Sequence, residues 1–314
     1  MKKSISTLLA ALMLTGALSG CGGSSSSDSS DSQASGNDSG VSGAITVISR
    51  EDGSGTRGAF IELTGVEEKN DAGEKIDNTT ADAEIANKTD VVLTSVAGNE
   101  KAIGYISLGA LNDTVKAVKV DGAEATVDNV KAGAYKLSRP FNIATKGEPT
   151  GLAKDFINFI LSKEGQAVVT DNKYIAVNDA AESFVSDGSS GQIAVGGSSS
   201  VSPVMEKLIE AYKSVNPNAS IDLQTSDSTS GMTGAMDGTF AIGMASRELK
   251  DEEAAQLTGT AIALDGIAVI VNPANTIDEL SMDQIKSIYV GDRRRIIRYF
   301  LHGMGQRFRS GRLH

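Results

Sequence analysis

The sequence predicts an α/β fold in which mostly parallel strands are covered by helices. Runs rich in β-branched residues predict strands at 45–48, 115–120 and 267–271. Between these runs lie stretches whose apolar residues recur at helical spacing, and several strand-to-helix connections are rich in serine and glycine. This alternation of strands and helices is typical of sheets flanked by helices.

The two clearest predicted helices cover residues 152–161 and 204–215. Phe156 and Phe159 share one face of the first helix, and the second has a similar apolar stripe. Pro203 favours the start of the second helix, because the first turn does not use the N–H group that proline lacks.

The first 21 residues have the layout of an export signal. Lys2 and Lys3 precede an apolar run over residues 8–18, and small residues then lead to Cys21. The run is about half as long as a bilayer-spanning helix, so we do not expect a permanent transmembrane segment. Cys21 is the only cysteine, so it has no partner for an intramolecular disulfide.

Two serine- and glycine-rich stretches divide the chain. Residues 22–44 hold almost no apolar side chains, so they cannot bury enough surface to offset their chain entropy, and we expect a flexible tether. Residues 186–191 have a similar composition and predict a joint within the body of the protein.

The composition changes abruptly after Asp292. The chain has four arginines up to that residue, whereas the last 22 residues hold seven more, both histidines and no acid. The abruptness favours a foreign end, such as the product of a frame shift. A basic tail that binds nucleic acid or a membrane is the alternative.

The four arginines before residue 292 are notable in a chain with a net charge of −11, because each lies in a predicted loop. They are Arg50, Arg57, Arg139 and Arg247. A guanidinium group is planar and has several donors, which suits it to tetrahedral oxyanions. Ion pairs with neighbouring acids such as Glu51 and Glu248 are the alternative role.

Three loops at 53–56, 196–201 and 226–231 follow predicted strands and precede helices. Glycine lets backbone N–H groups approach a ligand, and the N-terminus of the next helix presents further unpaired N–H groups. Each serine or threonine taken alone could be only a helix cap. Three such loops together with Arg247 favour one shared anion site. The first loop lacks the Gly-Lys-Ser/Thr of an ATP-binding loop.

Residue types argue against catalysis. No histidine precedes residue 302 and no cysteine follows residue 21, so the body holds neither a Ser-His-Asp or Cys-His set nor a His/Cys zinc site. No spacing of carboxylates indicates an acid–base pair. We therefore expect a binding protein that is not an enzyme and needs no metal or cofactor.

The chain resembles the phosphate-binding lipoproteins of bacterial Pst-type ABC importers. The matching stretches are VISREDGSGTRGAF, AIGYISLGAL, YKLSRPFNIATKGEP, FINFILSKEGQAVV, GSSSVSPVMEKLIEAY, IGMASREL and IALDGIAVIVNPAN. The resemblance covers nearly all of residues 45–291 and implies a two-lobed periplasmic-binding-protein-like fold. The sequence Leu18-Ser19-Gly20-Cys21 resembles a lipobox, which implies that residues 1–21 are a signal peptide and that Cys21 carries lipid.

The order of the segments differs from the family order. Residues 45–185 resemble the later portion of the family and residues 192–291 its beginning. The chain is then either a circular permutant or an incomplete fragment of a rearranged gene. In a permutant, one lobe would comprise 45–139 plus 265–292, the other would comprise 140–264, and the tail 293–314 would belong to neither.

Carried over motif by motif, the resemblance implies a phosphate site shared by both lobes. The first lobe would contribute Arg50, Ser54, Gly55 and Thr56, with Asp52 orienting Arg50 or accepting the proton of the ligand. The second lobe would contribute Ser199, Ser200, Ser228, Thr229, Ser246 and Arg247. Family members commonly have aspartate where this chain has Ala241, so one acidic contact is absent.

These features together predict an extracytoplasmic lipoprotein, anchored to the outer face of the cell membrane through Cys21, that captures inorganic phosphate. Its expected partners are the permease and ATPase subunits of an ABC importer, and no nucleic acid is expected. Three alternatives remain: a binding protein for another tetrahedral oxyanion, an anion-binding module without a transporter, and a rearranged chain without function.

Overall fold

The computed structural model describes residues 45–292. The predicted signal peptide, Cys21, the tether and the basic tail therefore lie outside the described residues. No helix among residues 45–292 is long and apolar enough to cross a bilayer.

Strands and helices alternate along this part of the chain, as the sequence predicted. The strands are β1 (Thr46–Arg50), β2 (Glu67–Lys69), β3 (Lys75–Asp77), β4 (Glu84–Ala86), β5 (Ala102–Ser107), β6 (Lys116–Ala117), β7 (Lys119–Val120), β8 (Ser138–Thr145), β9 (Gly191–Ser198), β10 (Ala219–Ser226), β11 (Ile242–Ala245), β12 (Thr258–Val271) and β13 (Glu279–Leu280). The α-helices are α1 (Gly55–Thr64), α2 (Thr89–Ala97), α3 (Val127–Lys131), α4 (Gly151–Leu161), α5 (Lys163–Asp171), α6 (Ser202–Val215), α7 (Ser228–Asp237), α8 (Asp251–Ala254) and α9 (Met282–Tyr289).

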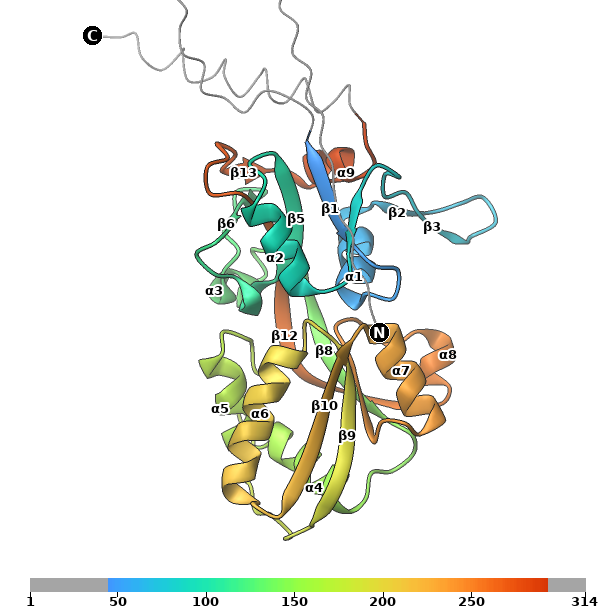
Figure 1. Ribbon diagram of the computed structural model, residues 1–314, viewed down its shortest axis with the longest axis vertical. Helices are drawn as coiled ribbons and strands as arrows, with labels where there is room; N and C mark the ends of the chain where they lie inside the picture. The colour runs from blue at the N-terminus through green and yellow to red at the C-terminus, as the bar shows by residue number, and fades with distance from the viewer. Residues whose placement is uncertain (1–44, 293–314) are drawn as a thin grey trace, which may run out of the picture. The chain divides into compact units, whose positions relative to one another are not determined.

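The largest sheet in the described chain has nine strands (Figure 1). Its main path runs β10-β9-β11-β8-β12-β5-β1-β4, and β6 pairs with β12. β9 is parallel to β10 and β11, and β1 is parallel to β4 and β5. β8 and β12, however, are antiparallel to their neighbours, so the sheet is mixed and the expectation of mostly parallel strands was wrong.

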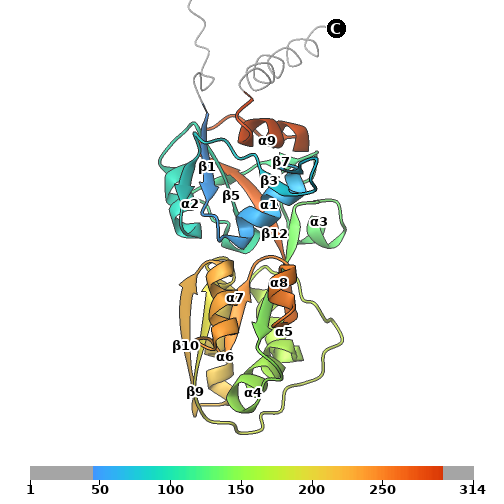
Figure 2. The ribbon, with the colours of Figure 1, turned by 90° about the vertical axis from the view of Figure 1, so that its right-hand side faces the viewer.

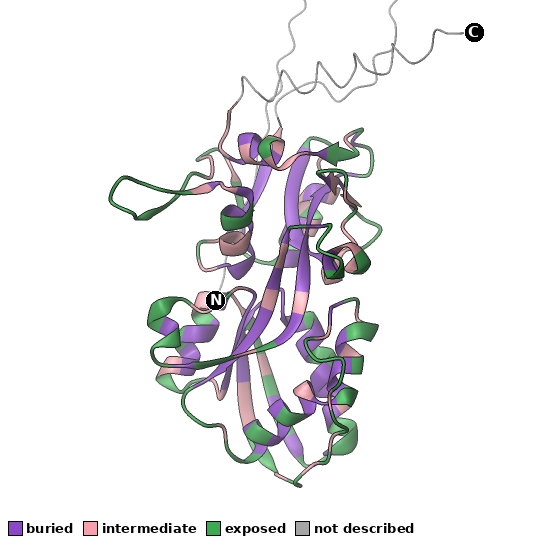
Figure 3. Ribbon diagram, turned by 180° about the vertical axis from the view of Figure 1, so that it is seen from behind, coloured by how far each residue is buried: buried purple, intermediate pink, exposed green. Residues whose placement is uncertain are grey.

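The direction of β8 and β12 follows from the two hydrophobic cores that they join. The first core takes most of its residues from 47–137 and 267–289, and the second core takes its residues from 141–263. β8 leads from the first core to the second and β12 leads back, so the two strands run in opposite directions. From Ile262 to Val271, every residue of β12 except Leu264 is buried (Figure 3).

The strands of the second core are covered on both faces. Ile143 of β8 and Met244 of β11 face the second core, whereas the next residues, Ala144 and Ala245, join a smaller cluster with Met232 of α7. Successive side chains of a strand point to opposite faces. The helices α4, α5 and α6 therefore cover one face and α7 covers the other (Figure 1).

The first core brings the two ends of the described chain together. The ring of Phe60 in α1 stacks on Tyr105 of β5 at 4.0 Å and meets Tyr289 of α9 edge-on at 4.7 Å. The Tyr289 hydroxyl donates to the Ile48 carbonyl at 3.3 Å. Figure 2 shows α9 over the same core as α1.

Several predicted elements are confirmed. α4 and α6 match the predicted helices, and Pro203 lies in the first turn of α6. The predicted strand at 115–120 is instead two short strands, because β6 pairs with β12 whereas β7 pairs with β13 in a separate sheet.

Asp155 of α4 ties the predicted joint at 186–191 to the second core. Its side chain is buried and accepts hydrogen bonds from Ser186 Oγ at 2.8 Å and from the Asp187 N–H at 2.9 Å. It also accepts from the Tyr212 hydroxyl of α6 at 2.6 Å. One carboxylate therefore holds both the joint and a helix in place.

We expect Asp155→Ala to lower the free energy of unfolding by about 2–4 kcal/mol, because it removes the acceptor of several buried donors. Urea unfolding measures this difference. The control is Asp187→Ala, whose exposed side chain predicts a change below about 1 kcal/mol. Equal changes in the two variants would contradict the role given to Asp155.

Candidate anion-binding site

The N-terminal ends of four helices meet beside one group of hydroxyls. Thr56, in the first turn of α1, lies 2.7 Å from Ser200, just before α6, measured between their side-chain oxygens. The side-chain oxygen of Thr89, the first residue of α2, lies 3.5 Å from those of Ser199 and Ser200. The fourth helix, α7, begins at Ser228, next to Gly55. Helix N-termini present unpaired N–H groups and positive dipole ends, which favour an anion.

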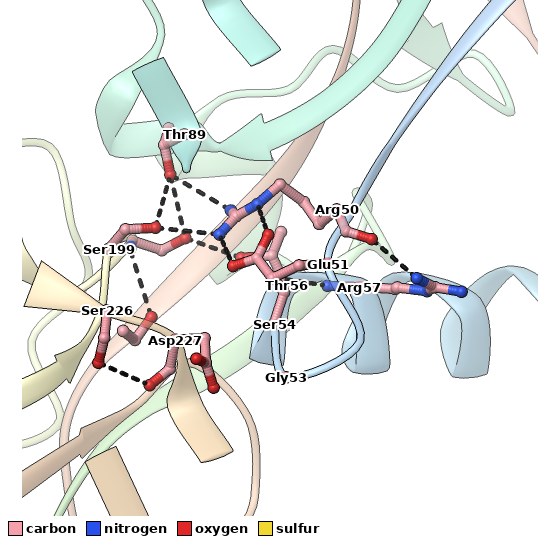
Figure 4. A network of polar contacts seen from close by, with 12 residues as sticks. Arg50, Glu51, Gly53, Ser54, Thr56, Arg57, Thr89, Ser199, Ser226 and Asp227 are labelled. Atoms are coloured by element: carbon pink, nitrogen blue, oxygen red, sulfur yellow. Dashed lines mark hydrogen bonds and ion pairs between the residues drawn. The ribbon is translucent and has the colours of Figure 1, made fainter. Parts of the chain in front are cut away.

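Arg50, the last residue of β1, is buried at the centre of this group (Figure 4). Its Nε and Nη2 donate to both oxygens of Glu51 at 2.8 and 2.7 Å. Nη2 also donates to Ser199 Oγ at 3.0 Å, and Nη1 lies 3.4 Å from Thr89 Oγ1. Arg50 therefore makes the ion pair predicted as an alternative and also contacts the hydroxyl-rich loop of the second core.

The loop before α1 approaches the second core closely. Ser54 caps α1, because its side chain accepts from the Arg57 N–H at 3.3 Å. The Gly53 carbonyl accepts from both the N–H and the hydroxyl of Thr229, at 3.2 and 3.3 Å. A Cβ atom on Gly53 would lie 2.3 Å from Asp227 Oδ1, so a larger residue would have to displace the Asp227 side chain.

The second core adds three buried serines. Ser198 Oγ donates to Ser246 Oγ at 2.9 Å, and the Ser246 N–H donates to Ser228 Oγ at 3.1 Å. Gly55 faces them from the first core, since a Cβ atom there would lie 2.4 Å from Ser228 Oγ and 2.9 Å from Ser246 Oγ. The backbone of the first core at Gly55 therefore packs directly against these serine side chains of the second core, because glycine has no side chain to separate them.

Arg247 has an acidic partner, but this partner is not the predicted Glu248. Its Nη1 and Nη2 donate to the two carboxylate oxygens of Glu253 at 2.7 and 2.8 Å. Burial favours a raised pKa for Glu253, but hydrogen bonds from Arg247 and from the Lys250 N–H outweigh burial and hold that pKa below its ordinary value. Nη2 of Arg247 also donates to Thr229 Oγ1 at 3.3 Å.

Asp52 does not lie beside Arg50, which corrects the first role expected for it. Its side chain is 96% exposed and pairs with Arg57 at 2.6 Å. Nε and Nη2 of Arg50 instead donate to Glu51, which lies between Arg50 and Asp52 in the sequence.

Two further residues singled out in the sequence have other surroundings. Arg139 pairs with Asp265 at 3.2 Å, and the two residues face each other across β8 and β12. Ala241 packs against the second core, and its N–H donates to the Ala194 carbonyl at 2.9 Å.

Thr89 belongs to this group although no feature of the sequence was taken to place it there. Thr89 precedes an apolar stretch, which is a signal for the start of a helix. That signal could have located the N-terminus of α2, but it carries no information about which other loops the helix faces. Within residues 45–292, no group of three or more His, Cys, Asp or Glu side chains could hold a metal ion.

Comparison with protein families identifies the class of protein to which this fold belongs. A family model described as a PBP superfamily domain matches residues 27–164 and 183–297. The chain therefore belongs to the PBP superfamily.

Closer relatives define the family within that class. The phosphate-binding protein PstS 2 of Streptococcus agalactiae serotype V is 51% identical over 282 residues, covering 89% of this chain and 92% of that protein. The phosphate-binding protein PstS 2 of Streptococcus pneumoniae serotype 4 is 51% identical over 251 residues, covering 80% and 86% of the two chains. A crystal structure of a phosphate-binding protein of a phosphate ABC transporter from S. pneumoniae TIGR4 has 51% identity and a TM-score of 0.64, covering 79% of this chain and 96% of that chain. This chain belongs to the family of PstS phosphate-binding proteins.

The alignment also bears on the order of the segments. An alignment over 92% of the S. agalactiae protein follows both chains in the same direction. This chain therefore shares its segment order with that relative.

Proposed function

We propose that this protein captures inorganic phosphate outside the cytoplasm and delivers it to the permease and ATPase subunits of an ABC importer. The observation that carries the proposal is the meeting of four helix N-termini with Arg50 and a set of buried hydroxyls. The names of the relatives, which are phosphate-binding proteins, support it.

The proposed ligands come from both cores. They are Arg50, Ser54, Gly55 and Thr56 from the first core and Ser199, Ser200, Ser228, Thr229, Ser246 and Arg247 from the second. Neutral donors together with the guanidinium groups of Arg50 and Arg247 can surround an oxyanion without requiring a positive net charge on the whole protein. Tyr105 supports this arrangement, because its hydroxyl accepts from the Arg50 N–H at 3.1 Å and holds the end of β1.

We also propose that the two cores are lobes, 45–139 plus 265–292 and 140–264, which close over the anion. β8 and β12 would be the hinge, because they are the strands that pass from one core to the other. A lipid on Cys21 and a tether over 22–44 would hold the protein at the outer face of the membrane, and the lipobox-like sequence supports this anchor.

Isothermal titration of the purified protein with phosphate and with sulfate tests the proposal. We expect Thr56→Val to weaken phosphate binding about tenfold or more, because a hydroxyl that donates to a buried anion is lost while the side-chain shape is kept. The matched control is Thr64→Val in the same helix, whose hydroxyl bonds to the Phe60 carbonyl at 2.6 Å. This control should bind phosphate as the unmodified protein does.

Two results would overturn the proposal. One is that the unmodified protein binds neither phosphate nor sulfate although it unfolds cooperatively. The other is that Thr56→Val and Thr64→Val have equal affinities for phosphate, which would remove the α1 N-terminus from the site.

A further inference from the structure

We infer that Arg57 is a positioning residue that fixes the anion loop, residues 50–54, and couples this loop to the exposed hairpin formed by β2 and β3. The inference rests on the proposed function, because the anion loop contributes Arg50 and Ser54 to the proposed site. Arg57 acts on the anion through the loop and not by direct contact.

Arg57 holds the anion loop at several points. Its N–H donates to Ser54 Oγ at 3.3 Å, the bond that caps α1. Its Nη1 donates to the Arg50 carbonyl at 2.8 Å (Figure 4) and to Asp52 Oδ1 at 2.6 Å. The two ends of the loop, the Arg50 carbonyl and the Ser54 side chain, are therefore held by one residue. The Arg57 side chain is 15% exposed, so these bonds are largely shielded from water.

The hairpin holds the other side of the same guanidinium group. Nε of Arg57 donates to Asp77 Oδ2 at 2.9 Å, and Nη2 lies 2.8 Å from the same oxygen. Asp77 is the last residue of β3, and its Oδ1 accepts from the N–H and the hydroxyl of Thr79 at 2.8 and 2.6 Å. Burial alone would raise the pKa of Asp77, but the bonds from Thr79 and the charge of Arg57 hold that pKa below its ordinary value. Asp77 is therefore charged at neutral pH and orients Arg57 toward the loop.

The contacts of Arg57 distinguish it from the two arginines proposed as ligands. Arg50 and Arg247 each donate to a hydroxyl of the candidate site, Ser199 for the first and Thr229 for the second. Nε and both Nη atoms of Arg57 instead contact acceptors of the first core and its loops. Loss of Arg57 would thus loosen the loop without removing a donor to the anion.

The coupling follows from two physical arguments. A loop that is ordered before binding loses less conformational entropy when it binds, so the Arg57–Asp77 pair raises anion affinity. By linkage, a bound anion must stabilise that pair, and with it the hairpin, by the same factor.

The hairpin is suited to respond to this coupling. β2 and β3 have three residues each and form a separate two-stranded sheet, which extends away from α1 in Figure 1. A hairpin of two strands is marginally stable in water by itself. Its order therefore depends on the side chains that tie it to the first core, among them Arg57.

The first test is titration of Asp77→Asn with sodium phosphate. We expect affinity about threefold to tenfold weaker than in the unmodified protein, because Arg57 loses the carboxylate that orients it. The direction is diagnostic. If Arg57 were itself a ligand, removal of a competing negative charge would leave phosphate affinity unchanged or raise it, and either result would overturn the inference.

Lys75→Gln is the matched control in the same strand. Lys75 pairs with Glu62 and Glu67 and is 54% exposed. This variant changes an ion pair of the hairpin but leaves Arg57 and Asp77 in place, so it should bind phosphate as the unmodified protein does. Equal affinities in Asp77→Asn and Lys75→Gln would contradict the role of Arg57.

The second test measures amide hydrogen exchange over residues 67–77 with and without saturating phosphate. In the unmodified protein we expect phosphate to slow this exchange by about the factor that Asp77→Asn costs in affinity. In Asp77→Asn, phosphate should leave the exchange of the hairpin unchanged. A purely structural role of the pair predicts no effect of phosphate in either protein, and that result would overturn the coupling. An unmodified protein that binds no phosphate would contradict the proposed function itself.

Discussion

Arg139→Met is expected to lower the free energy of unfolding by about 3–5 kcal/mol at pH 8, the cost of leaving a buried charge without its partner. The side chains of Arg139 and Asp265 are 1% and 0% exposed and lie 3.2 Å apart, in register across β8 and β12. Methionine preserves much of the apolar stem of arginine, so the loss reports chiefly on the charge. Urea unfolding of the variant and the unmodified protein measures it.

The loss of unfolding free energy caused by Arg139→Met should increase with pH. Burial raises the pKa of Asp265 to about 6 and lowers that of Arg139 to about 10, and the charge of each partner opposes both shifts. Without Arg139, the folded protein retains a proton on Asp265 that the unfolded chain releases above about pH 4. The folded state then binds more protons, so its stability falls as pH rises. We therefore expect a smaller loss at pH 5 than at pH 8.

The double replacement Arg139→Met with Asp265→Leu is the control. We expect it to recover most of the lost stability, because an apolar pair has no charge to desolvate. Nε and Nη1 of Arg139 have no hydrogen-bond partner within residues 45–292, so the replacement breaks few other contacts. A single variant that unfolds within about 1 kcal/mol of the unmodified protein at both pH values would contradict the role given to the pair.

Gly55→Ala is expected to weaken phosphate binding about a hundredfold while the protein stays folded. The added Cβ atom would lie 2.4 Å from Ser228 Oγ, too close for any real contact, so the two cores could not meet as they do here. Titration with phosphate measures the affinity, and urea unfolding shows that the fold is kept.

Gly58→Ala in the same helix provides the comparison. Its nearest neighbour would be Arg247 Cδ at 3.8 Å, an ordinary contact. We expect unchanged affinity and a gain in stability of up to about 1 kcal/mol, because alanine favours a helix over glycine. If Gly55→Ala bound phosphate as tightly as Gly58→Ala, close approach at residue 55 would not be needed for binding.

The sequence predicted the elements with strong local patterns and missed those that depend on distant pairing. The helices at α4 and α6 follow from apolar residues at helical spacing, which local packing alone can enforce. β12 begins at Thr258 with polar and glycine residues, so only its apolar end at 267–271 was recognised. The antiparallel direction of β12 depends on which core each end of the strand enters, and a local sequence pattern cannot predict that.

In the candidate site, the sequence predicted the loops but not which side chains pair with one another. The three serine- and glycine-rich loops could be predicted, because each lies between a strand and a helix. The choice of Glu51 over Asp52 for Arg50, and of Glu253 over Glu248 for Arg247, could not. Acids that lie close together in a sequence are equivalent candidates until the backbone fixes the direction of each side chain.

The packing of Tyr289 on Phe60 has a consequence for the order in which the protein acquires its structure during synthesis. The second core uses a continuous segment, 141–263, and all of that segment leaves the ribosome before residues 267–289 of the first core. β1 is made early, yet the Tyr289 hydroxyl that bonds to its Ile48 carbonyl lies 241 residues later in the chain. Contacts so distant in sequence form slowly. The first core therefore begins to be synthesised before the second core but is completed after it. Its early apolar strands, such as β1, stay without some of their packing partners until residues 267–289 have been made.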